Sequence, residues 1–204
     1  MVSIKEALAT ISIIHPKFVL LTGKSGIGKT YFSNHLKGYT VLELDVIILK
    51  IANKFKITPE HKAFSIYKNK QPEHITKTFV GEIHSFFDRH QSDPIVIDGA
   101  IKDASLVRRI FSGQYSVMTF VYLYAVDVKA YAMRMMKRYK DEKKRGIRSL
   151  AIWSEITPAI EALPLSSPKL FQFMIRMVRE SKAKSKEHFG YFSKAGFSIY
   201  RVNM

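Results

Sequence analysis

The sequence predicts an α/β fold in which a parallel β-sheet is covered by helices on both faces. Two observations carry this prediction. Short apolar, β-branched segments alternate along the chain with longer segments of helical character, which is the pattern of repeated strand–helix–strand units. A length of 204 residues is enough for one such domain with a well-buried core. We therefore expect a single domain over residues 1–204.

Five segments have the length and composition of buried strands. Each is a short run rich in apolar residues, and turn-forming or helical segments separate it from the next. In chain order, the expected strands are 18–22, 40–44, 94–98, 116–124 and 197–202. The sheet is expected to be parallel because helices connect these strands.

Helical segments lie before and between the strands. In chain order they are 4–14, 29–36, 46–55, 73–89, 103–111, 128–144, 147–163 and 168–189. His15-Pro16 should end the first of them, because the residue before a proline disfavours helical backbone. Asp127 should cap the helix that begins at Val128. Two helices fall within residues 46–93, so we expect a helical insert between the second and third strands.

The composition indicates a soluble globular protein. Hydrophobic residues make up 47% of the chain and charged residues 25%, and no apolar run is longer than a strand, so no membrane span is expected. The first residues lack the basic start and apolar block of a signal peptide. We therefore expect a cytoplasmic protein without a membrane partner, or one in the host cytoplasm if it is viral. The absence of cysteine excludes disulfides and thiolate metal sites.

The chain is strongly basic, with a net charge of +16 and a pI near 9.9. Such a charge attracts phosphate-rich partners, including DNA and RNA. The helical segment 168–189 carries a basic face, formed by Arg176, Arg179, Lys182, Lys184 and Lys186, which could meet nucleic acid. A solvated surface, or a generally lysine-rich composition, accounts for the same charge.

The segment Gly23-Lys24-Ser25-Gly26-Ile27-Gly28-Lys29-Thr30 is the most informative motif. It satisfies the P-loop pattern G-x-x-x-x-G-K-[ST], and it lies between an expected strand and an expected helix, as that pattern requires. Glycines let the backbone wrap a polyphosphate so that N–H groups point at its charge. Lys29 would reach the β- and γ-phosphates, and the Thr30 hydroxyl would ligate Mg²⁺. The alternative is a glycine-rich turn that matches by chance. We expect bound ATP.

A second acidic position supports a nucleotide site. The run Pro94-Ile95-Val96-Ile97 leads into Asp98-Gly99, which is typical of a Walker B carboxylate at the carboxyl end of a strand. Asp98 would lie near Thr30 and hold Mg²⁺ directly or through water. An ordinary Asp-Gly turn is the alternative. Because no second acid follows Asp98, the sequence argues against an ATPase motor.

On these residues the chain resembles the small P-loop kinases, a group that includes nucleoside, nucleotide, shikimate- and gluconate-type and polynucleotide 5′-hydroxyl kinases. The matching positions are Gly23 to Thr30, Asp45, Ile95 to Gly99 and the arginine-bearing helix after the fourth strand. The resemblance implies a three-layer P-loop NTPase fold with a five-stranded parallel sheet in the order 2-3-1-4-5. It also implies that the insert, about 46–93, covers the phosphoryl acceptor and that residues of about 134–148 form a lid. A plain helical layer remains the alternative for the insert.

The resemblance further implies catalytic roles. In several such kinases a carboxylate at the position of Asp45 accepts the proton of the attacking hydroxyl, and Glu43 is a second candidate. A cap of the helix expected from Val46 is the alternative role for Asp45. Arg134 and Arg138 are four residues apart and share a helix face. In the kinases that this chain resembles, such arginines clamp ATP and stabilise the transferring phosphoryl group, although a solvated basic helix end fits the sequence as well.

We therefore expect an ATP- and Mg²⁺-dependent kinase that transfers the γ-phosphoryl group to a hydroxyl of a nucleotide or nucleic acid. The acceptor would be a 5′-hydroxyl or a hydroxymethylated base in DNA, the latter by resemblance to certain phage P-loop kinases. A nucleoside, a nucleoside monophosphate or another small molecule is the alternative acceptor. Two other classes stay open: a nucleic-acid-binding NTPase without an acceptor, and a nucleotide-regulated binding module.

Overall fold

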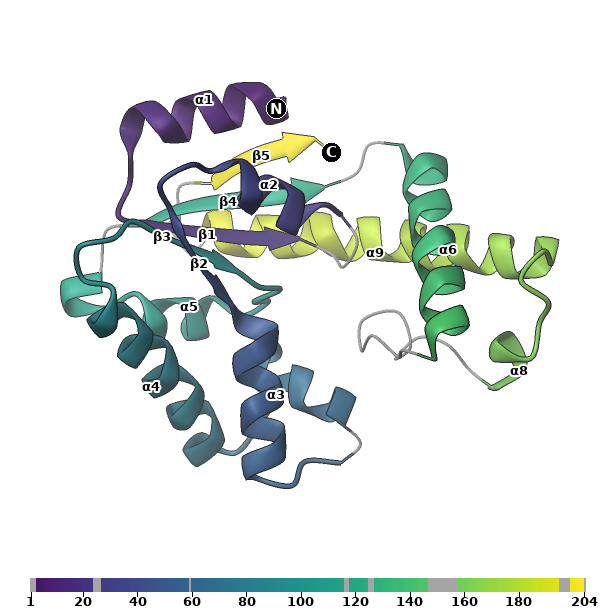
Figure 1. The fold of residues 1–204 in the computed structure, drawn as a ribbon, viewed down its shortest axis with the longest axis horizontal. Helices are drawn as coiled ribbons and strands as arrows, with labels where there is room; N and C mark the ends of the chain where they lie inside the picture. The colour runs from purple at the N-terminus through teal and green to yellow at the C-terminus, as the bar shows by residue number, and fades with distance from the viewer. Residues whose placement is uncertain are drawn as a thin grey trace.

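The computed structural model of the chain describes residues 3–23, 27–58, 60–115, 118–124, 127–146, 158–194 and 199–203. Parallel strands form one sheet in the order β2-β3-β1-β4-β5, and helices lie on both sides of it (Figure 1). The strands are β1 (Phe18–Gly23), β2 (Thr40–Glu43), β3 (Ile95–Asp98), β4 (Met118–Tyr124) and β5 (Ile199–Asn203). The α/β class and the parallel sheet predicted from the sequence are confirmed.

The helices also follow the expected pattern. In chain order they are α1 (Ile4–Ile14), α2 (Lys29–His35), α3 (Leu44–Lys54), the 3-10 helix η1 (Glu60–Lys68), α4 (Glu73–Arg89), α5 (Ala104–Ile110), the 3-10 turn η2 (Gly113–Tyr115), α6 (Val128–Arg145), α8 (Pro158–Glu161) and α9 (Pro168–Lys194). Of the helix expected over 147–163, residues 147–157 lie outside the described residues. None of the helices in the part of the chain that the structure describes combines the length and apolar character that a membrane crossing needs.

The register of the sheet brings three strand ends together. The fully buried strand β1 lies in the centre, between β3 and β4. Leu21 of β1 lies beside Asp98 of β3, and Glu43 at the end of β2 lies on the other side of the same Asp98. The carboxyl ends of β1, β2 and β3 therefore meet at one edge, which is where a parallel sheet usually holds its ligand.

Two hydrophobic cores separate the fold into three layers. Phe18 and Leu20 of β1 pack with α3, α4 and α5 on one face. Val19 and Leu21, which point the opposite way because strand side chains alternate, pack with α1, α2 and α6 on the other face. Helix α9 contributes to both cores, since its amino-terminal part packs with α6 while Phe192 near its end packs on the first face. Covering helices on both faces were predicted from the sequence.

The boundary between β2 and α3 corrects one prediction. The helix begins at Leu44 and not at Val46, so Asp45 lies in its first turn and is not its cap. Glu43 occupies the cap position, and its side chain makes no capping hydrogen bond. Glu43 and Asp45 therefore do not alternate along one strand, as the sequence suggested. The cause is the buried helical stripe of α3, which comprises Leu44, Ile47, Ile48 and Ile51 and reaches its full length only if the helix starts at Leu44.

A close contact holds the start of α3 against the end of β3. Leu44 and Gly99 are both buried, and a Cβ atom added to Gly99 would lie 2.5 Å from Leu44 Cδ1 and 2.9 Å from Leu44 Cγ. Atoms cannot approach so closely, so a glycine is required for this packing. Asp45 follows Leu44 and Asp98 precedes Gly99, so the contact also keeps these two carboxylates near each other.

We expect Gly99→Ala to lower the free energy of unfolding by about 1–3 kcal/mol, the usual cost of overpacking a filled core. Urea unfolding measures this change. Gly81→Ala is the matched control, because an added Cβ there meets no atom within 4 Å. Gly81 lies inside α4, where alanine is favoured over glycine by about 1 kcal/mol, so this variant should gain stability. A Gly99→Ala protein as stable as the wild type would show that Leu44 moves aside without cost.

Candidate functional site

The candidate site lies at the edge where β1 and β3 end. Lys29 is the first residue of α2, and its Nζ atom lies 4.0 Å from Asp98 Oδ1 at the end of β3. Both side chains are largely buried, with 15% and 11% of their surface exposed. This separation is at the outer limit for an ion pair, and the lysine ammonium group carries three N–H donors, which suit an anion.

At Gly23, where the glycine-rich loop begins, the backbone has no room for a side chain. Gly23 ends β1 with φ +151°, and a Cβ atom there would lie 2.8 Å from the carbonyl oxygen of Leu123. Gly28 precedes α2 with φ +106° in the cap position, where no side chain caps the helix. Lys24, Ser25 and Gly26, which the sequence assigned to the phosphate loop, lie outside the described residues.

The pKa of Asp98 is shifted, and burial is the main cause. Burial raises the pKa of Asp98 from its ordinary value of 3.8 to about 6. The charge of Lys29 and a hydrogen bond from the Thr30 hydroxyl oppose this shift, whereas the charges of Asp45 and Glu43 add to it. The structure thus gathers the predicted residues Lys29, Thr30, Asp45 and Asp98, together with Glu43, at one place. Negative charge is in excess there, which favours the binding of a cation.

The donor set fits a hard divalent cation. Thr30 and Asp98 offer a hydroxyl and a carboxylate oxygen, and Thr30 is close enough to lower the pKa of Asp98. Among the described residues, no group of three or more His, Cys, Asp or Glu side chains could hold a metal ion. Such an ion would therefore need further oxygen ligands from water or a bound phosphate. Mg²⁺ is bound in this way in many phosphate sites.

Asp45 is held by a residue that the sequence analysis missed. The hydroxyl of Tyr67 in η1 donates a hydrogen bond to Asp45 Oδ1 at 2.5 Å. Tyr67 is buried, with 3% of its surface exposed, whereas Asp45 is exposed. No motif or spacing marks Tyr67 in the sequence, because it lies in the irregular part of the insert and its partner is distant along the chain.

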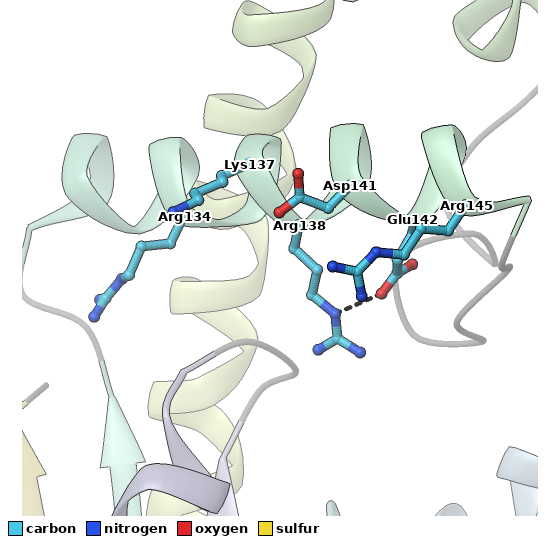
Figure 2. A pocket seen from close by; sticks show the side chains of 6 residues that line it. All are labelled: Arg134, Lys137, Arg138, Asp141, Glu142 and Arg145. Carbon is cyan, nitrogen blue, oxygen red and sulfur yellow. Dashed lines mark hydrogen bonds and ion pairs between the residues drawn. The ribbon is translucent and has the colours of Figure 1, made fainter.

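The basic residues of α6 form a separate pocket of about 340 Å³. Its lining among the described residues comes entirely from α6 and consists of Arg134, Lys137, Arg138, Asp141, Glu142 and Arg145. Figure 2 shows the side chains of Arg134 and Arg138 extending from the same side of the helix, and this agrees with the prediction that they share a face. Lys29 and Asp98 are not among the residues that line this pocket.

Within the pocket, the two arginines have different partners. Arg138 Nε donates to Glu142 Oε1 at 2.7 Å, an ion pair one helical turn apart. The guanidinium group of Arg134 lies 5.8 Å from the centre of the Tyr131 ring. Arg134 itself is exposed. Asp127 caps α6 as predicted, since its carboxylate accepts the N–H groups of Lys129 and Ala130. The residues 147–148 of the expected lid lie outside the described residues.

Comparisons with known proteins do not assign the chain to a family. No protein-family model matches it, and no curated protein sequence matches it. Among solved structures, the chain is similar to a gluconokinase from Sinorhizobium meliloti 1021, with a TM-score of 0.42 and 16% sequence identity over 86% of this chain and 95% of that one. Neither a family nor an activity follows from a likeness at this level.

We expect Asp98→Asn to stabilise the protein above pH 6. The folded-state pKa of about 6 exceeds the ordinary 3.8, so the folded protein binds this proton more tightly than the unfolded chain. The free energy of unfolding therefore falls as pH rises from about 4 to about 6. Removal of the charge should raise stability near pH 8 by on the order of 1–3 kcal/mol, and this gain should vanish near pH 4. Urea unfolding at several pH values tests this; a gain that does not change with pH would contradict the raised pKa.

Proposed function

We propose that the protein is a P-loop kinase that transfers the γ-phosphoryl group of ATP to a hydroxyl group. One observation carries the proposal. The sequence pattern Gly23 to Thr30 joins β1 to α2, and its Lys29 faces Asp98 at the end of the neighbouring strand at 4.0 Å. A chance glycine-rich turn would not require a lysine and a hydroxyl group beside a buried carboxylate.

In this proposal, the phosphate loop and Lys29 bind the triphosphate. The lysine exchanges its contact with Asp98 for the β- and γ-phosphate oxygens, where its charge offsets the charge that develops on the leaving ADP. Thr30 and Asp98 would hold Mg²⁺, which would supply positive charge that offsets part of the charge of the phosphates. Protonated Asp98 is a poor metal ligand, so metal binding is expected to weaken as pH falls below the Asp98 pKa of about 6.

Asp45 is the proposed general base. The acceptor hydroxyl oxygen forms a bond to the γ-phosphorus, the bond from that phosphorus to the β–γ bridging oxygen breaks, and the hydroxyl proton passes to the Asp45 carboxylate. The location of Asp45 in the first turn of α3, beside the strand ends, supports this role. Glu43 is the second candidate, because its charge also acts on Asp98.

The remaining machinery would come from the insert and from α6. We propose that the residues of about 46–93 cover the acceptor and that Arg134 and Arg138 approach the phosphates when about 134–148 closes as a lid of this single domain. Figure 1 supports this arrangement, since α3 and η1 lie on one side of the strand ends and α6 lies on the other. Guanidinium groups suit phosphate oxygens because they offer several donors in one plane.

The acceptor that we propose is a hydroxyl group of a nucleotide or nucleic acid. The net charge of +16 supports it, because this charge attracts polyanions. A 5′-hydroxyl and a hydroxymethylated base in DNA are the forms to test first, and a small molecule is the alternative. An NTPase without an acceptor is disfavoured, because Gly99 stands where a motor would carry its second acid.

We expect the wild-type protein to transfer label from [γ-³²P]ATP to one class of acceptor. The Lys29→Ala variant should not transfer it. The panel comprises nucleosides, nucleoside monophosphates, sugars, oligonucleotides and duplex DNA with hydroxymethylated bases, separated by thin-layer chromatography. Lys5→Ala, an exposed lysine of α1, is the control and should retain full transfer. Free phosphate alone, released faster with nucleic acid, would support the NTPase alternative instead.

We expect Asp45→Asn to lower kcat by about 100- to 10,000-fold, the usual contribution of a general base, while the KM for ATP changes little. Steady-state kinetics with the acceptor found above measures both constants. Glu43→Gln is the matched comparison, because it neutralises the other nearby exposed acid. If Glu43→Gln were the impaired variant and Asp45→Asn were active, the roles of these two residues would be exchanged.

A further inference from the structure

A short hydrogen bond joins Tyr67 to the proposed base, Asp45. Tyr67 Oη donates to Asp45 Oδ1 at 2.5 Å, a short distance that is typical of hydrogen bonds from a hydroxyl to a charged carboxylate. Within the part of the chain that the structure describes, this is the hydrogen bond made by the Asp45 side chain. Among the described residues, the second carboxylate oxygen, Oδ2, has no such hydrogen bond.

Tyr67 is itself fixed at three points. Its ring packs edge-on against Phe79, with centres 6.3 Å apart, in the hydrophobic core that joins the insert to the sheet. Its carbonyl oxygen accepts the N–H of Lys102 at 2.7 Å. Its hydroxyl oxygen also accepts a hydrogen bond from the backbone N–H of Ala100. Both backbone groups belong to the segment that follows Asp98, so the phenol is positioned relative to β3.

The hydroxyl group thus links two parts of the site. It accepts from Ala100, two residues after Asp98, and donates to Asp45 in the first turn of α3. Burial, and then the charge of Asp45, raise the pKa of Tyr67 well above 10, so the hydroxyl stays protonated and remains a donor. A buried phenol hydroxyl needs a hydrogen-bond partner. This requirement alone does not explain why the partner of Tyr67 is Asp45, an exposed carboxylate at the strand ends.

We infer that Tyr67 is a positioning residue, whose hydroxyl holds Oδ1 of Asp45 so that Oδ2 faces the phosphoryl acceptor. This inference rests on the proposed function and adds to it a residue that the phosphate-loop pattern does not contain. An unrestrained Asp45 side chain, exposed at a helix start, would sample several rotamers. Misplacement of a reacting group by about 1 Å can cost about 100-fold in rate.

Tyr67→Phe tests the inference because it removes the hydroxyl and keeps the ring. We expect kcat to fall about 10- to 100-fold, with the KM for ATP and the melting temperature close to wild type. Tyr115→Phe is the matched control: the Tyr115 hydroxyl donates to the Asp88 carboxylate at 2.6 Å, the same kind of pair outside the site. This control should leave kcat unchanged. A Tyr67→Phe enzyme with wild-type kcat would overturn the inference.

A double-mutant cycle separates positioning from a merely structural effect. If Tyr67 acts through Asp45, Tyr67→Phe should change kcat less than twofold in the Asp45→Asn background. If the two losses multiply, Tyr67 acts by another route and the inference is wrong. Proton NMR of the wild type and Asp45→Asn gives a second measurement that does not need Tyr67→Phe to fold. A downfield hydroxyl resonance should be present and should move in Asp45→Asn; its absence would overturn the inference.

The outcomes also separate this inference from the proposed function. Loss of activity in Lys29→Ala and Asp45→Asn, with full activity in Tyr67→Phe, refutes the role of Tyr67 and leaves the kinase proposal intact. Full activity in Asp45→Asn refutes both the base and its positioning residue, whereas the kinase proposal still stands on Lys29. Absence of transfer from ATP to any acceptor refutes the kinase proposal and the inference together.

Discussion

The pairing of the central strand β1 with its parallel neighbours decides where every group of the candidate site lies. β1 is buried along its whole length, and β3 lies beside it in a register that sets Asp98 next to Leu21. Lys29 begins the helix that follows β1, and Glu43 ends the strand on the other side of β3. Groups from three separate parts of the sequence thus lie near one edge of the sheet, and the register of β1, β2 and β3 sets the positions of Glu43 and Asp98. Packing of nearby side chains, such as Leu44 against Gly99, then sets the remaining details of the site.

The electrostatics of this edge are dominated by the buried carboxyl group of Asp98. The charges of Glu43 and Asp45 raise the pKa of Asp98, and the charge of Lys29 opposes them. Burial of Asp98 raises the free energy of its charged form, and the raised pKa measures that penalty. A divalent ion and a triphosphate would together add charges of both signs and relieve the penalty. The raised pKa of Asp98 is therefore compatible with the metal-binding role that the kinase proposal gives this residue.

Local sequence patterns were sufficient for much of the fold and for part of the site. The strand before Gly23, the helix after it and the carboxylate at the end of β3 each depend on neighbouring residues, so they could be predicted. The start of α3 could not, because it depends on packing of Leu44 against Gly99, a residue far away in the sequence. Tyr67 could not be predicted either, since a 3-10 helix has no amphipathic repeat that reports burial, and its partner Asp45 lies 22 residues earlier. In both cases a long-range contact determines the position of the proposed base.

Helix α9 has a mechanical consequence for the arginines of α6. Its first half shares a core with α6 through Leu170 and Met174, while Phe192 near its far end packs at a tilt against Phe120 of β4, with ring centres 4.9 Å apart. The single helix α9 thus connects α6 to strand β4. A change in the position of α6, and of Arg134 and Arg138 on it, would therefore also disturb the packing of α6 on α9.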